Sequence, residues 1–247
     1  MYKCGLVSVS FRNNTVEEIV KAVKYAGLSC IEWGSDVHAK NTDTERLTQI
    51  ADLCKKENIE ICSYGTYFKL GETPISQLLS YINAAKTLNT DILRLWCGVK
   101  GYKEYTDTEF SALVSECKAS AKIAEENGVT LCMECHNNTV TDCIDGALRM
   151  MKEVDSDNFK MYWQPNQYKS LRENIEYARK IAEYTTHIHV FNWEGNNKYP
   201  LCDGIKIWQK YLAEFDENHA LLLEFMPDND INSLNTEAKV LFEIIKG

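Results

Sequence analysis

The sequence predicts a (β/α)8 barrel, the TIM-barrel architecture, formed by one domain that spans residues 1–247. Eight short apolar runs recur at intervals of about thirty residues, and a helix-like segment follows each run. Strict alternation of strand and helix requires a parallel sheet, and eight repeats are enough to close that sheet into a barrel. An open, doubly wound sheet is the alternative that the same alternation allows.

The expected strands are short and rich in Val, Ile, Leu, Cys and aromatic residues, as parallel strands buried on both faces are. The first run continues as SVSFRNNT, without the G-x-G-x-x-G turn that marks a dinucleotide-binding sheet. The eight expected strands span residues 4–9, 29–33, 59–64, 91–96, 130–135, 159–164, 187–192 and 220–225.

The expected helices carry start and stop signals of their own. The first begins at Thr15, which forms a capping box with Glu18, and the first four each end at a residue that tolerates the left-handed conformation. These four residues are Gly27, Asn58, Asn89 and Gly128. The eight expected helices span residues 15–26, 43–57, 74–88, 106–127, 142–154, 171–184, 205–215 and 236–246.

The composition is that of a packed globular protein, with 45% hydrophobic residues and only 4 prolines. The net charge of −9 and the pI of about 5.2 disfavour binding to nucleic acid or to an anionic membrane. No apolar stretch approaches the ~20 residues that span a bilayer, and MYKCGLVSVSF starts in strand-like alternation rather than as a signal peptide. We therefore expect a cytoplasmic protein without nucleic-acid or membrane partners, and the sequence leaves open whether it forms a homo-oligomer.

Ten cysteines are scattered through the chain, most of them inside apolar runs, which favours buried free thiols over disulfides. Cys132, Cys135 and His136 spell the C-x-x-C-H pattern of covalent haem attachment. Because this segment is an expected buried strand and such attachment needs export, we expect no haem.

Polar residues stand where four of the expected strands end. These residues are Glu134, Gln164, His189 and Glu224. The active site of a (β/α)8 barrel is built at the carboxyl ends of its strands, so the four side chains are expected to form a ring around a bound substrate. The long expected loops GTYFKLGET and WEGNNKYPLCDG follow strands on the same face, where loops hold substrate.

Four tryptophans also fall at strand ends, where they would line the mouth of the barrel. They are Trp33, Trp96, Trp163 and Trp193. Sugar rings present apolar C–H faces, for which an indole ring is a good platform. Core packing is the alternative, and it is expected to hold for at least one of the four.

Three kinds of basic side chain are further candidates for substrate contact. His38 and His136 each follow a strand, and they either bind substrate hydroxyls or cap loops. Arg94 lies within an apolar run and requires a partner, which is either Glu32, in a structural pair, or a substrate oxygen. Lys198 is the only cation near the ends of the seventh and eighth strands, where barrels often hold phosphate, so we expect an unphosphorylated substrate.

With these motifs in order, the chain resembles the xylose isomerase-like TIM-barrel superfamily, which includes sugar isomerases, ketose 3-epimerases, inosose dehydratases and AP endonucleases. Within it, the sequence resembles bacterial sugar phosphate isomerase/epimerase proteins. The resemblance covers nearly the whole chain and rests on IEWGSDVHA, SYGTYFKLG, ILRLWCG, MECHNNTVTD, YWQPNQ, HVFNW and LLEF.

In the epimerase branch, one divalent cation is held by a Glu, an Asp, a His and a Glu from strands five to eight. The resemblance places Glu134, Gln164, His189 and Glu224 at these positions, with Gln164 in place of the Asp. Gln167 stands three residues after Gln164, where the family usually has a His, and we expect it to bind substrate. An amide oxygen can ligate Mg²⁺, Mn²⁺ or Zn²⁺ but brings one less negative charge, so the resemblance implies a weakened metal site and leaves metal binding open.

The ring suits chemistry next to a carbonyl group of a carbohydrate. Glu134 and Glu224 would act as base and acid around an enediolate, as in a sugar or sugar-acid isomerase or epimerase of carbohydrate metabolism. An inosose-type dehydratase uses the same enediolate, and the two glutamines of the ring also allow a non-catalytic sugar-binding barrel. A DNA-repair hydrolase fits least, because its multi-zinc cluster needs many ligands and the chain has 5 histidines.

Overall fold

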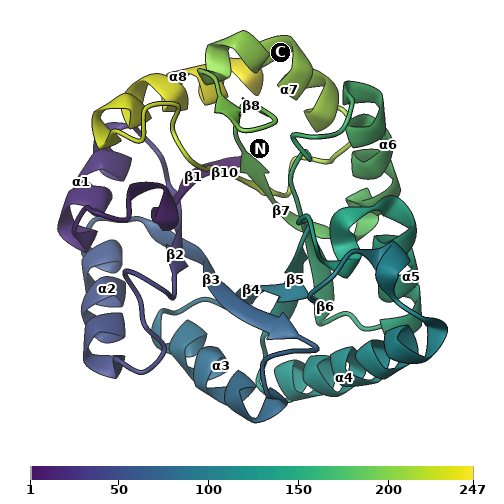
Figure 1. Ribbon diagram of the computed structural model, residues 1–247. Helices are drawn as coiled ribbons and strands as arrows, with labels where there is room; N and C mark the ends of the chain where they lie inside the picture. The colour runs from purple at the N-terminus through teal and green to yellow at the C-terminus, as the bar shows by residue number, and fades with distance from the viewer. Residues whose placement is uncertain (1, 247) are drawn as a thin grey trace.

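The computed structural model describes residues 2–246 and confirms the (β/α)8 barrel (Figure 1). In this part of the chain, eight parallel strands form a closed ring in which the last strand pairs with the first. The strands, in the order of the ring, are β1 (Lys3–Val7), β2 (Cys30–Gly34), β3 (Glu60–Leu70), β4 (Ile92–Cys97), β5 (Thr130–Glu134), β6 (Phe159–Trp163), β7 (Thr185–Val190) and β10 (Ala220–Leu223).

One helix follows each strand and packs on the outside of the ring, as Figure 1 shows. The helices are α1 (Val16–Tyr25), α2 (Thr44–Lys56), α3 (Leu78–Thr87), α4 (Asp107–Glu126), α5 (Ile144–Val154), α6 (Leu171–Ile181), α7 (Ile205–Leu212) and α8 (Leu234–Ile244). The loop after β7 contains a small antiparallel hairpin of β8 (Trp193–Glu194) and β9 (Asn197–Lys198).

The predicted helix signals are confirmed. The Thr15 hydroxyl accepts a hydrogen bond from the Glu18 amide, and the Glu18 carboxylate accepts one from the Thr15 amide, which forms the capping box at the start of α1. The four residues predicted to end helices all have positive φ. The values are 73° at Gly27, 57° at Asn58, 59° at Asn89 and 67° at Gly128.

Strand β3 differs from the prediction, since it continues to Leu70 instead of ending at residue 64. After an irregularity that begins at Gly65, the chain pairs again with β4 through Leu70. Phe68 and Leu70 are fully buried, and the Thr66 hydroxyl donates a hydrogen bond of 2.9 Å to the backbone of β4. Most of the segment GTYFKLGET is therefore strand, and its burial against β4 and the helices stabilises the extension.

The core has two parts, and the smaller part determines where the site lies. The larger part fills the space between barrel and helices. The smaller part lies inside the barrel and consists of Val7, Val9, Cys30, Cys62, Cys132, Tyr162, Ala220 and Leu222. Because side chains alternate along a strand, Glu32 shares the inner face of β2 with Cys30 but lies nearer the carboxyl end. The interior is thus apolar toward the amino ends of the strands and charged toward their carboxyl ends.

The ten cysteines are free thiols, and all but Cys143 and Cys202 are buried. Burial raises the pKa of Cys132 and Cys135 to about 12, so both are protonated and unreactive near neutral pH. Among residues 2–246, no helix is long and apolar enough to cross a membrane.

Candidate functional site

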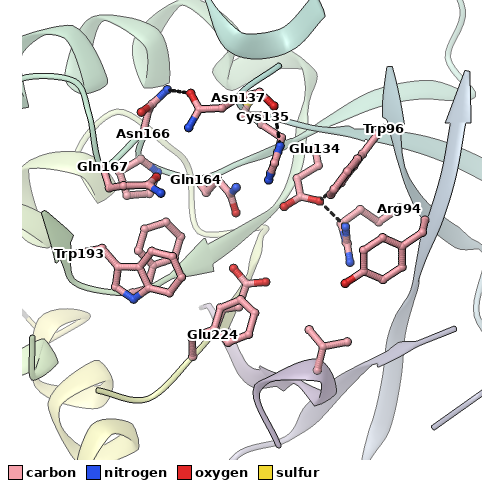
Figure 2. Close-up of a pocket in the computed structure, with 16 residues that line it drawn as sticks. Arg94, Trp96, Glu134, Cys135, Asn137, Gln164, Asn166, Gln167, Trp193 and Glu224 are labelled. Carbon is pink, nitrogen blue, oxygen red and sulfur yellow. Dashed lines mark hydrogen bonds and ion pairs between the residues drawn. The ribbon is translucent and has the colours of Figure 1, made fainter. Parts of the chain in front are cut away.

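The candidate site lies inside the barrel at the carboxyl ends of the strands. A cavity of about 250 Å³ opens there between residues that lie in, or shortly after, seven of the ring strands. Figure 2 shows Glu134, Gln164 and Glu224 pointing toward one another across this cavity, with Trp96 and Trp193 on opposite sides of it. The lining residues are Val9, Tyr67, Arg94, Trp96, Glu134, Cys135, His136, Asn137, Gln164, Pro165, Asn166, Gln167, Phe191, Trp193, Glu224 and Phe225.

Four potential ligand atoms meet at the base of the cavity. One ligand atom from each of Glu134, His189 and Glu224 lies within 4.8 Å of those from the other two, and all three residues are buried. His189 Nδ1 lies 3.9 Å from Glu134 Oε1 and 3.6 Å from Glu224 Oε2. The same nitrogen lies 3.0 Å from Gln164 Oε1. One imidazole nitrogen therefore faces three oxygens, one from the end of β5 and two from the residues that directly follow β6 and β10.

A buried ion-pair network lies beneath these atoms. The Arg94 guanidinium donates through Nε to Glu32 Oε1 at 2.7 Å and through Nη1 to Glu134 Oε2. Glu32 also accepts a hydrogen bond of 2.8 Å from the Ser63 hydroxyl, and Glu134 Oε2 accepts one of 2.6 Å from the Trp96 indole. Every charge in the network has a partner, as buried charges require. The expected Arg94–Glu32 pair is present, and the same guanidinium also holds Glu134.

The network sets the charge states of its members. Burial raises the pKa of Glu32 and of Glu134, but the Arg94 guanidinium, His189 and the hydrogen bonds to these carboxylates together outweigh burial and keep both pKa values below the usual range. Glu224 is different, because burial and the nearby Glu134 carboxylate raise its pKa to about 7. Burial lowers the pKa of His189, but the Glu224 and Glu32 carboxylates outweigh it and raise that pKa. The carboxylates that favour a proton at His189 also favour a metal cation there.

The donor set fits a divalent cation. Atoms that share an ion at about 2.1 Å lie roughly 3 to 4 Å from one another, which is the spacing found around His189 Nδ1. The other imidazole nitrogen of His189, Nε2, is buried and has no hydrogen bond among the described residues. It lies 3.6 Å from Glu32 Oε1. A carboxylate behind a histidine is the usual support of a metal ligand. Glu134, Gln164, His189 and Glu224 would hold the cation.

The predicted substrate-binding residues divide into two groups. Those that line the cavity are Arg94, Trp96, His136, Gln167 and Trp193. Trp96 and His136 stack with ring centroids 4.4 Å apart and planes 19° apart, which makes one flat wall. Trp193 lies 5.0 Å from Phe191 and 5.5 Å from Phe225 and forms an aromatic wall on the other side. Arg94 is at the cavity but is already held by two carboxylates.

Trp33 and Trp163 do not line the cavity, and the prediction that they do is wrong. In β2 and β6 the neighbouring Glu32 and Tyr162 face the interior, so alternation turns both tryptophans toward the helices. Both are fully buried there, and Trp163 packs against Trp208 of α7 with ring centroids 6.1 Å apart. Period-two alternation was the signal in the sequence that would have separated them from Trp96.

His38 and Lys198 also lie outside the cavity lining. His38 is buried and bridges the Ser8 hydroxyl and the backbone carbonyl of Asn14, so it supports a loop rather than a substrate. Lys198 donates to Asn229 at 2.7 Å, and its ammonium lies over Trp193, 5.1 Å from the ring centroid. Lys198 therefore lies outside the cavity, on the other side of Trp193.

Several lining residues were not predicted from the sequence. They are Val9, Tyr67, Cys135, Asn137, Pro165, Asn166, Phe191 and Phe225. The side-chain amide of Asn166 donates to Asn137 at 2.7 Å, which joins the segments that follow β5 and β6. The run ECHNN carried the signal for Asn137, since it places polar side chains directly after a strand. Tyr67 carried none, because its position depends on the extension of β3.

Comparisons with known proteins agree with this fold. A family described as xylose isomerase-like TIM barrel matches residues 20–239. A 3-dehydroshikimate dehydratase from Bacillus anthracis is 26% identical, with 97% of this chain and 96% of that protein aligned.

Two solved structures share the fold over nearly their whole length. A probable 3-DHS dehydratase from Bacillus anthracis has a TM-score of 0.83 at 19% identity, covering 98% of this chain and 99% of that one. A D-psicose 3-epimerase from Clostridium cellulolyticum H10 has a TM-score of 0.71 at 14% identity, covering 99% and 98%.

The buried network makes a steric prediction at Gly65. A Cβ there would lie 2.5 Å from Glu32 Oε1 and 2.7 Å from Arg94 Nη2, too close for either group. Gly65→Ala is therefore expected to lower the free energy of unfolding by about 3 kcal/mol, measured by urea denaturation.

Gly128→Ala is the matched control for this substitution. Its φ is 67° and no atom lies within 4 Å of the added Cβ, so only the backbone cost of about 1 kcal/mol is expected. Equal losses in the two variants would show that the Arg94–Glu32 pair does not need the space at Gly65.

Proposed function

The chain belongs to the xylose isomerase-like TIM-barrel family, and from this premise we propose that it is an enzyme that removes a proton next to a carbonyl group. The observation that carries the proposal is the convergence of Glu134, His189 and Glu224 within 4.8 Å at the base of the cavity. A divalent cation, when bound, supplies Lewis-acid stabilisation of the negative charge that develops as the proton leaves. Mn²⁺ and Mg²⁺ suit the oxygen-rich donor set best.

The two carboxylates have different roles in this proposal. Glu134 Oε2 accepts hydrogen bonds from Arg94 and Trp96, so this oxygen is not available to take a proton. No hydrogen bond to the Glu224 carboxylate is found within residues 2–246, and Glu224 lines the cavity. Glu224 therefore acts as the general base, while Glu134 stays anionic, holds the cation and orients the substrate.

We propose dehydration of a cyclic hydroxyketone as the reaction, with 3-dehydroshikimate as the first substrate to test. The relative that carries this activity aligns with 97% of the chain. Two facing aromatic walls, Trp96 with His136 and Trp193 with Phe225, suit a flat ring. Glu224 takes the proton next to the carbonyl, the electron pair forms a carbon–carbon double bond, and the neighbouring hydroxyl leaves with that proton as water.

Epimerisation of a ketose is the second candidate. Glu134 and Glu224 lie on different sides of the cavity in Figure 2, as return of a proton to the opposite face of a substrate requires. Sugar 3-epimerases are among the solved structures that share the fold. The lining residues that are free to donate, such as Gln167 and Asn137, are uncharged amides that suit hydroxyl groups.

Metal affinity tests the donor set. Gln164→Glu keeps the shape of the side chain and adds a negative charge 3.0 Å from His189 Nδ1, so Mn²⁺ is expected to bind about tenfold more tightly in isothermal titration calorimetry. Gln167→Glu adds the same charge to the cavity wall, outside the four ligand atoms, and is expected to change the affinity less. An equal gain in both variants would argue against Gln164 as a ligand, and a wild-type protein that binds no Mn²⁺ would refute the metal site.

Turnover tests the role of Glu224. Glu224→Gln keeps the size of the side chain but removes the base, so kcat is expected to fall by about 10² to 10⁴. The control is Glu125→Gln, which changes an exposed carboxylate on α4 and should leave kcat unchanged. The assay supplies Mn²⁺ with 3-dehydroshikimate or a panel of ketohexoses and follows the product by mass and chirality.

The product distinguishes the candidate functions. A product lighter by one water supports dehydration, and a stereoisomer of equal mass supports epimerisation. Binding of these compounds without conversion would refute both and favour the non-catalytic sugar-binding barrel.

A further inference from the structure

The segment that follows β1 links both neighbouring strands of the ring at the mouth of the barrel. Residues Ser8–Phe11 form a short 3-10 turn in which all four side chains are buried. The Ser8 hydroxyl accepts a hydrogen bond of 2.9 Å from the Gly34 amide, at the end of β2. The Ser10 hydroxyl accepts one of 2.9 Å from the Phe225 amide, just beyond β10. The two serines of the motif SVS therefore contact the two strand ends on either side of β1, Ser8 at β2 and Ser10 beyond β10.

Phe225 has an unusual backbone. Its φ is 52°, in the left-handed region that side chains other than Gly, Asn and Asp rarely adopt. Such strain persists only where surrounding contacts support it, and it clusters at functional sites. The Ser10 hydroxyl is one support, and the other is the Phe225 ring, which lies 5.5 Å from Trp193 at the cavity wall.

The strained residue directly follows Glu224. The Glu224 amide donates 3.0 Å to the carbonyl of Val190 in β7, and the next amide along the chain donates to Ser10. Glu224 is thus anchored on both sides by successive backbone hydrogen bonds, one to β7 and one to the turn after β1. Its carboxylate itself has no hydrogen bond among the described residues, so the backbone is what aims it at His189, 3.6 Å away.

We propose that Ser10 is a positioning residue for Glu224, and the proposal rests on the proposed role of Glu224 as ligand and base. Without the hydroxyl, the half-buried Phe225 amide loses its acceptor, and the left-handed turn loses one of its two supports. The backbone then relaxes toward negative φ, which rotates Glu224 away from His189 and from Gln164. Ser10 does not line the cavity, so it acts only through this turn.

The test compares two serines of the same turn. Ser10→Ala is expected to weaken Mn²⁺ binding by about tenfold to a hundredfold and to lower kcat more than it changes KM. Ser8→Ala removes another buried hydroxyl of the turn, which contacts Gly34 and His38 instead of Phe225, so Mn²⁺ affinity is expected to stay within about twofold of the wild type. Ser10→Thr, which retains a hydroxyl, should restore binding.

Crystal structures supply a readout that does not depend on activity. In Ser10→Ala, Phe225 is expected to take a negative φ and Glu224 to move away from His189, while both stay in place in Ser8→Ala. Ser10→Cys, with a weak acceptor of similar size, replaces Ser10→Ala if that variant does not fold.

Two results would overturn the proposal. One is a Ser10→Ala structure in which Phe225 and Glu224 keep their wild-type positions, and the other is an equal loss of Mn²⁺ affinity in Ser8→Ala. If the wild type converts no substrate while Ser10→Ala still displaces Glu224, the proposed function fails and the positioning role stands. If the wild type is active and Ser10→Ala matches it, the positioning role alone fails.

Discussion

The Arg94 guanidinium, buried between Glu32 and Glu134, is the interaction on which the rest of the site depends. A buried ion pair is costly unless each charge is met, and here Ser63 donates to the other oxygen of Glu32 while Trp96 donates to the Glu134 oxygen that Arg94 also contacts. The network fixes one oxygen of Glu134, which leaves the other free to face the cavity. It also places Glu32 behind His189, so that the opposite ring nitrogen faces the ligand atoms. A structural ion pair thereby determines the geometry of a chemical site.

The same network determines the charge of the barrel interior. Glu32, Glu134 and Glu224 lie close to one guanidinium, so the ionised interior carries an excess of negative charge that a divalent cation would balance. Burial is the main cause of the raised pKa of Glu224, and the neighbouring Glu134 carboxylate adds to it. A fourth carboxylate in place of Gln164 would increase the excess. The neutral amide of Gln164 would supply an oxygen ligand at that position without adding charge.

The backbone around Glu224 shows a second kind of constraint. The Glu224 carboxylate has no hydrogen bond to direct it among the described residues, and the backbone that carries it leads into a turn with positive φ at Phe225. That turn also places the Phe225 ring in the aromatic wall with Trp193. The strained backbone at Phe225 therefore affects both the direction of the Glu224 carboxylate and the shape of the cavity wall. Contacts from the turn after β1 and from β7 support this segment, so the neighbours of β10 share in building the site.

Much of the fold and part of the site follow from the sequence by itself. Apolar runs at regular spacing, with Gly27, Asn58, Asn89 and Gly128 at helix ends, determine the alternation of strands and helices, because these signals are local. The ring positions of Glu134 and Glu224 follow from the same alternation, since barrel strands end on one face. The outward direction of Trp33 and Trp163 could also have been predicted from the sequence. It depends only on whether the adjacent residue in the strand faces the barrel interior.

Only the tertiary structure decided which of these residues meet. The extension of β3 depends on pairing with β4, and the bridge from Arg94 to Glu32 and Glu134 joins residues 62 and 40 positions apart. The contact of Ser10 with the turn at Phe225 spans 215 positions and exists because closure of the ring makes the first and last strands neighbours. Local patterns set the direction of each side chain along its own strand. Contacts between distant segments, and the charge states that follow from them, arise only when the barrel closes.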